Sequence, residues 1–122
     1  MTRPARVIVN VSAVRANFKV VQAYAPRTRV MAIVKADAYG HGIARIAGAL
    51  ERQADAFGVA SLDEALALRN AGIEGSIVLL EGPFAADEVG EIVANGFETV
   101  VHTQAQLRPL SEAKADIPLW VK

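Results

Sequence analysis

Arg29-Val30-Met31-Ala32-Ile33-Val34-Lys35 is the stretch that decides the fold, because it is a short, continuous apolar run with a charged residue at each end. Four further runs follow it along the chain: Ala56–Ser61, Ser76–Glu81, Phe97–His102 and Ile117–Lys122. Each run is rich in β-branched or aromatic residues and is continuous rather than alternating, which is typical of strands buried on both faces of a parallel sheet. We therefore predict five parallel strands over these ranges.

The segments between the runs have the spacing of amphipathic helices. Helices are predicted over Ile43–Gln53, Leu62–Ala71, Ala85–Ala94 and Thr103–Ala113, with an additional one at about Ser12–Ala23. Ser61 and Glu64 have the spacing of a capping box at the start of the second of these helices, and Gly72 fits its carboxyl end. Pro109 makes the middle of the last predicted helix less secure.

The order of the predicted elements is a strand and a helix in regular alternation, and right-handed crossovers then build a parallel sheet. A doubly wound open sheet and the first part of a (β/α)8 TIM-type barrel both fit this order. The nearly constant spacing, and the lack of a G-x-G-x-x-G motif after the first strand, favour the barrel. Such a barrel usually needs about 250 residues. We therefore expect residues 1–122 to be a partial barrel domain of a longer polypeptide.

Composition excludes several classes of function. The 122 residues are 52% hydrophobic and 21% charged, as in a folded globular domain. Thirteen basic residues balance thirteen acidic ones, which argues against general nucleic-acid binding. The lack of cysteine excludes disulfides, thiolate nucleophiles and Cys-ligated metals, and we expect no metal site. The apolar runs are far shorter than the ~20 residues of a membrane helix, so we expect a cytoplasmic protein without membrane partners.

One segment, Val34–Gly42, combines several groups that can perform chemistry. It follows the first predicted strand, and active sites of (β/α)8 barrels lie at the carboxyl ends of the strands. A neutral amine of Lys35 can form a Schiff base with an aldehyde cofactor, and Tyr39 is close enough in sequence to offer its hydroxyl to a phosphate. The loop glycines allow close approach, and their amides are candidates for binding an anion. Alternatively, Lys35 reaches solvent or pairs with Asp37, and the segment is an ordinary loop.

The string Lys-Ala-Asp-Ala-Tyr-Gly-His-Gly at Lys35–Gly42 resembles, almost letter for letter, the pyridoxal-phosphate attachment motif of the alanine racemases. The resemblance continues on both sides of the motif. Val7–Asn17 resembles the opening strand and first helix of that family, Phe57–Ala65 its second strand and helix, Ile77–Gly82 its third strand, and Leu119–Lys122 its fifth strand. The resemblance therefore covers essentially the whole chain.

This resemblance implies roles for individual residues. Lys35 would hold pyridoxal 5'-phosphate as an internal aldimine and act as one of two bases that move the substrate α-proton. Tyr39 would donate a hydrogen bond to the cofactor phosphate. Lys122 matches a family lysine that is often carbamylated; the alternative is an unmodified strand-end lysine in an ion pair. Asp37 and His41 would support the loop without a direct chemical role.

The resemblance also implies the setting of the site. The enzyme would interconvert L- and D-alanine, for peptidoglycan synthesis or alanine catabolism. The barrel would continue into a C-terminal, mostly-β domain, and a homodimer would share its active sites, because the second base is a tyrosine of the partner subunit. Neither tyrosine of this chain, Tyr24 or Tyr39, matches that base. The alternatives are a broad-specificity amino-acid racemase or a basic-amino-acid decarboxylase of the same fold, and a non-catalytic module that binds the cofactor.

Overall fold

A computed structural model describes residues 3–122, and its elements follow the predicted alternation. They are α1 (Val11–Tyr24), β1 (Met31–Ile33), α2 (Lys35–Gly40), α3 (Ile43–Leu50), β2 (Ala56–Val59), α4 (Leu62–Asn70), β3 (Ser76–Leu79), the 3-10 helix η1 (Ala86–Glu88), α5 (Val89–Ala94), β4 (Glu98–Val101), α6 (Gln104–Glu112) and β5 (Leu119–Val121). All five predicted strands and all five predicted helices are confirmed; the strands and the last four helices are shorter than predicted, whereas α1 extends one residue further at each end. The pattern of apolar residues does not predict α2.

The five strands form one parallel sheet in the order β1-β2-β3-β4-β5. Ala56 of β2 lies opposite Met31 on one side and Ser76 on the other, so the first three strands start at the same level. Each strand thus lies beside the next one in the chain, whereas a doubly wound sheet reverses its strand order at a switch point. The sequential order confirms the α/β prediction and identifies the first five strands of a (β/α)8 barrel.

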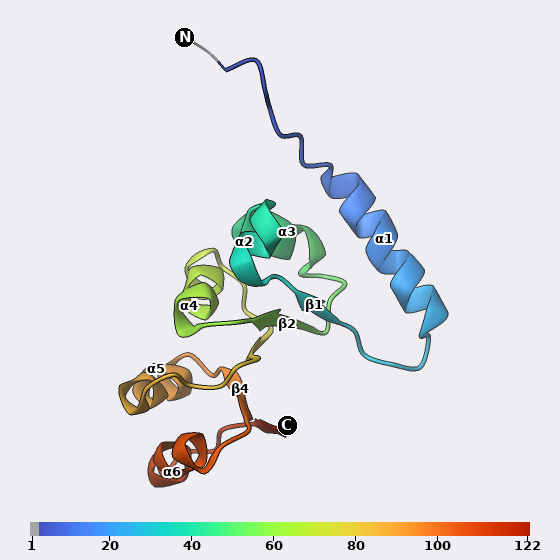
Figure 1. Cartoon of the computed structure of the whole chain (residues 1–122). Helices are drawn as coiled ribbons and strands as arrows, with labels where there is room; N and C mark the ends of the chain where they lie inside the picture. Colours follow the sequence, from blue (N-terminus) through green and yellow to red (C-terminus); the bar gives the residue numbers. More distant parts are fainter. Residues whose placement is uncertain (1–2) are drawn as a thin grey trace.

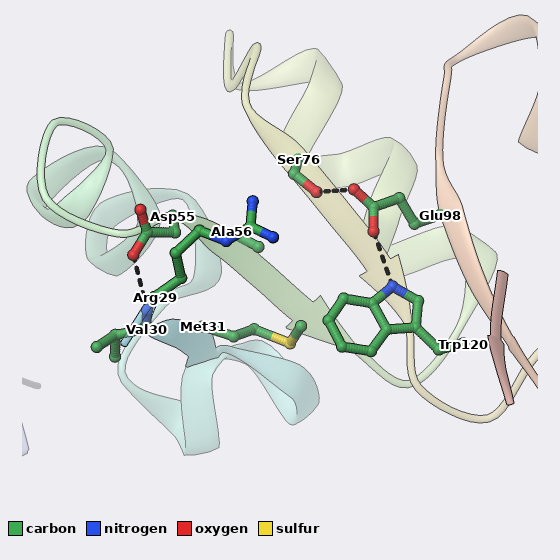
Figure 2. Close-up of a pocket in the computed structure, with 8 residues that line it drawn as sticks. All are labelled: Arg29, Val30, Met31, Asp55, Ala56, Ser76, Glu98 and Trp120. Atoms are coloured by element: carbon green, nitrogen blue, oxygen red, sulfur yellow. Dashed lines mark hydrogen bonds between the residues drawn. The ribbon is translucent and has the colours of Figure 1, made fainter. Parts of the chain in front are cut away.

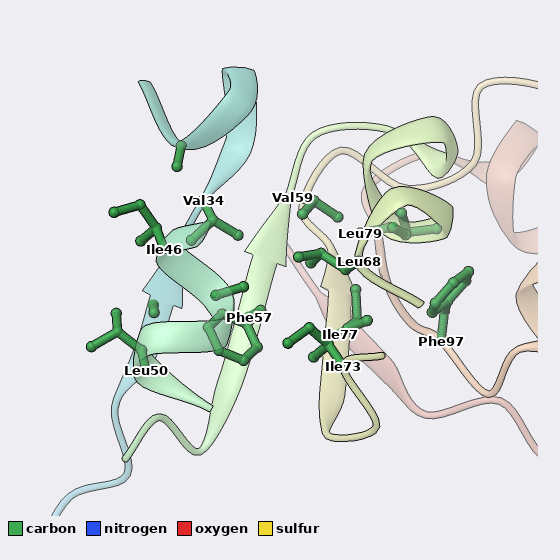
Figure 3. Close-up of a cluster of buried hydrophobic side chains, with 14 of the residues drawn as sticks. Val34, Ile46, Leu50, Phe57, Val59, Leu68, Ile73, Ile77, Leu79 and Phe97 are labelled. Carbon is green, nitrogen blue, oxygen red and sulfur yellow. The ribbon is translucent and has the colours of Figure 1, made fainter. Parts of the chain in front are cut away.

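One apolar layer lies between the sheet and its helices. Helices α3, α4, α5 and α6 follow one another along one side of the strands (Figure 1). Strand residues of this layer pack against residues of the helices and loops (Figure 3): Val34, Phe57, Val59, Ile77 and Leu79 against Ile46, Leu50, Leu68, Ile73 and Phe97. Eight of these ten side chains are at most 2% exposed, so burial of this layer holds the helices to the sheet.

The opposite face of the sheet is also apolar but is only partly covered. Gly58 has no side chain on this face, and a Cβ placed there would lie 2.7 Å from Cδ1 of Ile33 and 3.0 Å from Sδ of Met31. Ile33 is 40% exposed. This face corresponds to the inside of a barrel, where side chains of neighbouring strands fill the interior.

The helix ends agree with the capping signals in the sequence. Asn10, Ser61 and Thr103 each accept a hydrogen bond from the backbone N–H three residues further on. Gly72 follows α4 with a φ of +88°, which fits the predicted end of that helix. Helix α6 continues through Pro109, so the proline does not end the helix.

The segment before α1 runs away from the sheet (Figure 1). Val7 and Ile8 are 86% and 74% exposed. The family resemblance implies an opening strand in this segment. Within residues 3–122 the segment forms no strand, because no other strand lies beside it to share hydrogen bonds. In the same described part of the chain, no helix combines the length and the apolarity that a membrane crossing requires.

Arg69 near the end of α4 joins two loops, the one between α4 and β3 and the one between α5 and β4. Its guanidinium donates hydrogen bonds to the carbonyl oxygens of Ile73 (2.7 Å), Gly75 (2.8 Å) and Asn95 (3.1 Å). It also lies 5.2 Å from the ring centre of Phe97. Burial lowers the pKa of Arg69, while nearby Glu74 opposes that shift. The planar guanidinium, with its several donors, thus serves three carbonyl acceptors at once.

We predict that Arg69→Ala lowers the free energy of unfolding of the intact protein by about 2–4 kcal/mol, because three carbonyl groups lose a charged donor. Arg69→Lys should recover only part of this loss, since a lysine cannot reach the three acceptors in one plane. Urea denaturation measures the free energy of unfolding of both variants. The control is Arg108→Ala, which removes only the exposed ion pair with Glu112 and should change stability by at most about 0.5 kcal/mol. Equal effects of Arg69→Ala and Arg108→Ala would contradict this role.

Candidate functional site

Lys35 lies where the sequence predicts it, two residues after the end of β1 at the carboxyl edge of the sheet. Its side chain is half-buried. Because all five strands are parallel, the residues that follow the other strands lie along this same edge. They include Ala60 after β2, Leu80 after β3 and His102 after β4.

The residues after Lys35 form a left-handed turn. Ala36, Asp37, Ala38 and Tyr39 all have φ between 53° and 55°, with ψ between 39° and 50°. The left-handed conformation costs roughly 1–2 kcal/mol for each residue with a Cβ. Four such residues in a row persist only where the surroundings stabilise them.

Hydrogen bonds on every side hold this turn. The N–H of Ala38 donates to the carbonyl oxygen of Val34 at 2.8 Å. The N–H of Ile43, at the start of α3, donates to Oδ1 of Asp37 at 2.8 Å, and Nδ1 of His41 lies 2.9 Å from the carbonyl oxygen of Ala38. These contacts confirm that Asp37 and His41 support the loop.

A further contact to the turn comes from α4 and was not predicted. Oε1 of Glu64 accepts a hydrogen bond from the N–H of Ala36 at 2.7 Å. The sequence assigns Glu64 only to a capping box with Ser61, and Ser61 Oγ does accept from the N–H of Glu64, at 3.4 Å. Spacing along the chain cannot show that the same carboxylate also reaches a different strand end.

The donor groups of the turn fit a phosphate-bearing aldehyde cofactor, with one change from the prediction. Lys35 and Asp37 form no ion pair within residues 3–122, which leaves the amine available. Tyr39 is 61% exposed, so its hydroxyl can reach a ligand. The amide of Gly42 was expected to help bind an anion, but it donates to the carbonyl oxygen of Asp37 at 2.9 Å. The exposed hydroxyl of Tyr39 thus stays the predicted phosphate contact.

Lys122 lies at the far end of the same edge. Its backbone N–H donates to the carbonyl oxygen of Val101 at 3.0 Å, directly after β5, and its side chain is exposed. Since β1 and β5 are the outermost strands, Lys35 and Lys122 are separated by four strand spacings of about 4.8 Å each. The structure places both lysines on one edge without bringing them into contact.

A pocket lies at the other edge of the sheet, away from Lys35 (Figure 2). It is lined by residues at or near the starts of the strands, among them Arg29, Asp55, Ser76 and Glu98, and by Trp120 of β5. The carboxylate of Glu98 accepts hydrogen bonds from the hydroxyl of Ser76 and from Nε1 of Trp120, the latter at 2.7 Å. These contacts link β3, β4 and β5 on the side of the amino ends of the strands, where active sites of (β/α)8 barrels are not found.

Comparisons with known proteins agree with one another. The model of the family described as "Alanine racemase, N-terminal domain" matches residues 9–122. An alanine racemase of Halorhodospira halophila is 48% identical over 100% of this chain, which corresponds to 34% of that protein. The chain thus spans about a third of the length of the curated relatives it matches.

Solved structures show the same likeness. The biosynthetic alanine racemase of Pseudomonas aeruginosa has a TM-score of 0.85 and 38% identity over 93% of this chain and 32% of that one. A histidine racemase of Leuconostoc mesenteroides has a TM-score of 0.80 and 26% identity over 89% of this chain and 30% of that one. The fold is therefore shared by racemases with different substrates.

We predict that Ala36→Gly raises the unfolding midpoint of the intact protein, because glycine adopts a positive φ without the cost borne by alanine. The expected gain is about 0.5–1 kcal/mol. Ala67→Gly is the matched control: Ala67 is exposed in the middle of α4, where glycine costs about 1 kcal/mol. The same chemical change should thus have opposite signs at the two positions. A loss of stability at both would show that Ala36 is not left-handed in solution.

Proposed function

The chain belongs to the alanine racemase family, whose N-terminal domain it matches over residues 9–122, and on that premise we propose that it forms the cofactor-binding part of an enzyme that interconverts L- and D-alanine. The observation that supports this most directly is the place of Lys35: a half-buried lysine at the carboxyl end of β1, followed by a fixed left-handed turn that presents Tyr39. The enzyme would act on a free amino acid in the cytoplasm.

The residues at this edge would hold pyridoxal 5'-phosphate. Nζ of Lys35 would bind its aldehyde carbon covalently, and the hydroxyl of Tyr39 would donate a hydrogen bond to its phosphate. When bound, the cofactor supplies an electron sink for the charge left when the α-proton is removed. The backbone of the turn would keep the backbone positions of Lys35 and Tyr39 at a constant separation, because its hydrogen bonds to Val34, Glu64 and Ile43 fix the residues between them.

Racemisation needs a proton to leave one face of the substrate and another to arrive at the opposite face. The amine of Lys35 would serve one face. Tyr24 is a poor candidate for the other face, because it lies 88% exposed at the end of α1, and α1 packs against α3 on the outside of the sheet. We therefore propose that the second base comes from the partner subunit of a homodimer.

Lys122 would have a supporting role. Carbamylation would convert its side chain to an anion, and an anion at the carboxyl end of β5 could orient a cationic group near the cofactor. Its exposure leaves room for the modification. The D-alanine formed would supply peptidoglycan synthesis, or the reaction would run toward alanine catabolism.

A second candidate is a racemase with broader or different substrate specificity. The likeness to the histidine racemase supports this second candidate, because proteins that share a fold can differ in the size of the substrate pocket. Chirality-sensitive assays of the intact enzyme with L-alanine and with L-histidine separate the two candidates. Turnover of alanine at least tenfold faster supports the first.

Lys35→Ala should abolish turnover of alanine, because the change removes both the cofactor attachment and one base. The expected loss in kcat is at least about 10³-fold. Lys19→Ala is the control, since Lys19 is an exposed lysine on the outside of α1. The rate of conversion of L- to D-alanine by the intact enzyme measures both. Turnover by Lys35→Ala within tenfold of the unchanged enzyme would refute the proposal.

Tyr39→Phe should weaken retention of the cofactor by about 1–3 kcal/mol, because a hydrogen bond to a charged phosphate is lost. Fluorescence titration of the cofactor-free enzyme with pyridoxal phosphate gives the dissociation constants. Tyr24→Phe removes the same hydroxyl from the exposed end of α1 and should leave the affinity unchanged. Equal affinities of all three proteins would remove Tyr39 from the site.

A further inference from the structure

Two polar side chains occupy the same place in two different strand–helix units. Glu64 is the third residue of α4, and Gln106 is the third residue of α6. In a capping box the residue at this position returns to the backbone N–H of its own N-cap residue. Here each side chain instead accepts a hydrogen bond from the N–H of the residue before the N-cap. Each also forms a hydrogen bond with the backbone near the end of the neighbouring strand that precedes it in the chain.

Glu64 joins the ends of β2 and β1. Its Oε2 accepts a hydrogen bond from the N–H of Ala60, the residue before the N-cap Ser61, at 2.7 Å. Its Oε1 accepts from the N–H of Ala36 at 2.7 Å. Both carboxylate oxygens are thus used as acceptors, and one of them holds the peptide group that directly follows Lys35.

Gln106 joins the ends of β4 and β3 in the same manner. Its Oε1 accepts from the N–H of His102, the residue before the N-cap Thr103, at 3.0 Å. Its Nε2 donates to the carbonyl oxygen of Glu81 at 2.7 Å. The close approach also requires Gly82, since a Cβ there would lie 2.5 Å from Nε2 of Gln106 and 2.6 Å from the carbonyl oxygen of Val100.

The chemical difference between the two side chains matches the strand end that each one meets. After β3 the chain presents the carbonyl oxygen of Glu81, which needs a donor. The amide of Gln106 supplies one, whereas a carboxylate could not. After β1 the left-handed turn presents an N–H, which needs a second acceptor and therefore the carboxylate of Glu64. A glutamine at position 64 could satisfy only one of the two N–H groups, because its NH2 would face the other donor.

We propose that Glu64 is a positioning residue for Lys35: its carboxylate fixes the Lys35–Ala36 peptide group and so aims the amine at the cofactor and the substrate α-proton. This inference rests on the function proposed above. The carboxylate acts through the backbone and is not assigned any contact with substrate. A displacement of about 1 Å in a catalytic group can cost about 10²-fold in rate, and loss of the Ala36 contact would free the turn at its first residue.

The test uses Glu64→Gln in the intact holoenzyme, with Gln106→Ala as the matched control. Glu64→Gln keeps the size of the side chain and one of its two hydrogen bonds, so the protein should fold. Gln106→Ala removes all three side-chain hydrogen bonds of the equivalent contact, to His102, Glu81 and Pro83, at a strand end distant from Lys35. Three quantities are measured: kcat and KM for alanine, the rate at which pyridoxal phosphate attaches to the cofactor-free protein, and the midpoint of thermal unfolding.

We expect Glu64→Gln to lower kcat roughly 10–100-fold, with KM changed by less than about threefold, and to slow cofactor attachment by a similar factor. Gln106→Ala should lower the unfolding midpoint at least as much, yet leave kcat and the attachment rate within about threefold of the unchanged enzyme. A purely structural role would instead lower kcat in both variants in proportion to stability.

Kinetic constants and attachment rates of Glu64→Gln that equal those of the unchanged enzyme would overturn the inference, as would equal losses in both variants. Failure of the proposed function gives a different result, since the unchanged enzyme would then hold the cofactor without isomerising alanine. In that case slower attachment in Glu64→Gln alone still supports the positioning role, and equal attachment rates refute it.

Discussion

Burial of one apolar layer between a parallel sheet and the helices on one side of it is the constraint on which the other features depend. Phe57, Ile77 and Leu79 of the strands are at most 2% exposed, and covering them requires a helix after each strand. Parallel strands joined by right-handed crossovers then end at one edge. Lys35 therefore shares its edge with the ends of every other strand, although the chain between β1 and β5 is long.

The same constraint explains why polar side chains of the helices connect strand ends. Each helix begins at the carboxyl edge, so the third residue of α4 and that of α6 lie close to two strand ends at once. At the preceding strand end, Glu64 accepts a hydrogen bond from a backbone N–H, whereas Gln106 donates one to a backbone carbonyl oxygen. At β1 the contact stabilises four left-handed residues whose conformation costs free energy. The rigid scaffold thus offsets local strain at the segment that contains the candidate site.

The sequence was sufficient for the architecture, because continuous apolar runs and helical spacing are local signals. The Lys-Ala-Asp-Ala-Tyr-Gly-His-Gly string also predicts Lys35 and Tyr39 as site residues, and the structure places Lys35 at the carboxyl edge of the sheet. The sequence did not predict the left-handed turn, because alanine and tyrosine do not favour a positive φ and only contacts distant in sequence stabilise it there. The contact between Glu64 and Ala36 spans 28 residues, and the Arg69 contacts with Asn95 span 26. No periodic pattern encodes such pairs.

The central claim is that Lys35 is the lysine that holds the cofactor. Borohydride reduction of the intact protein purified with its cofactor would fix the cofactor irreversibly to the lysine that holds it, and peptide mapping by mass spectrometry would identify that residue. The account predicts a single cofactor adduct, on the peptide that contains Lys35. An adduct on any other lysine, including Lys122, or a protein that retains no cofactor after saturation with pyridoxal phosphate, would contradict it.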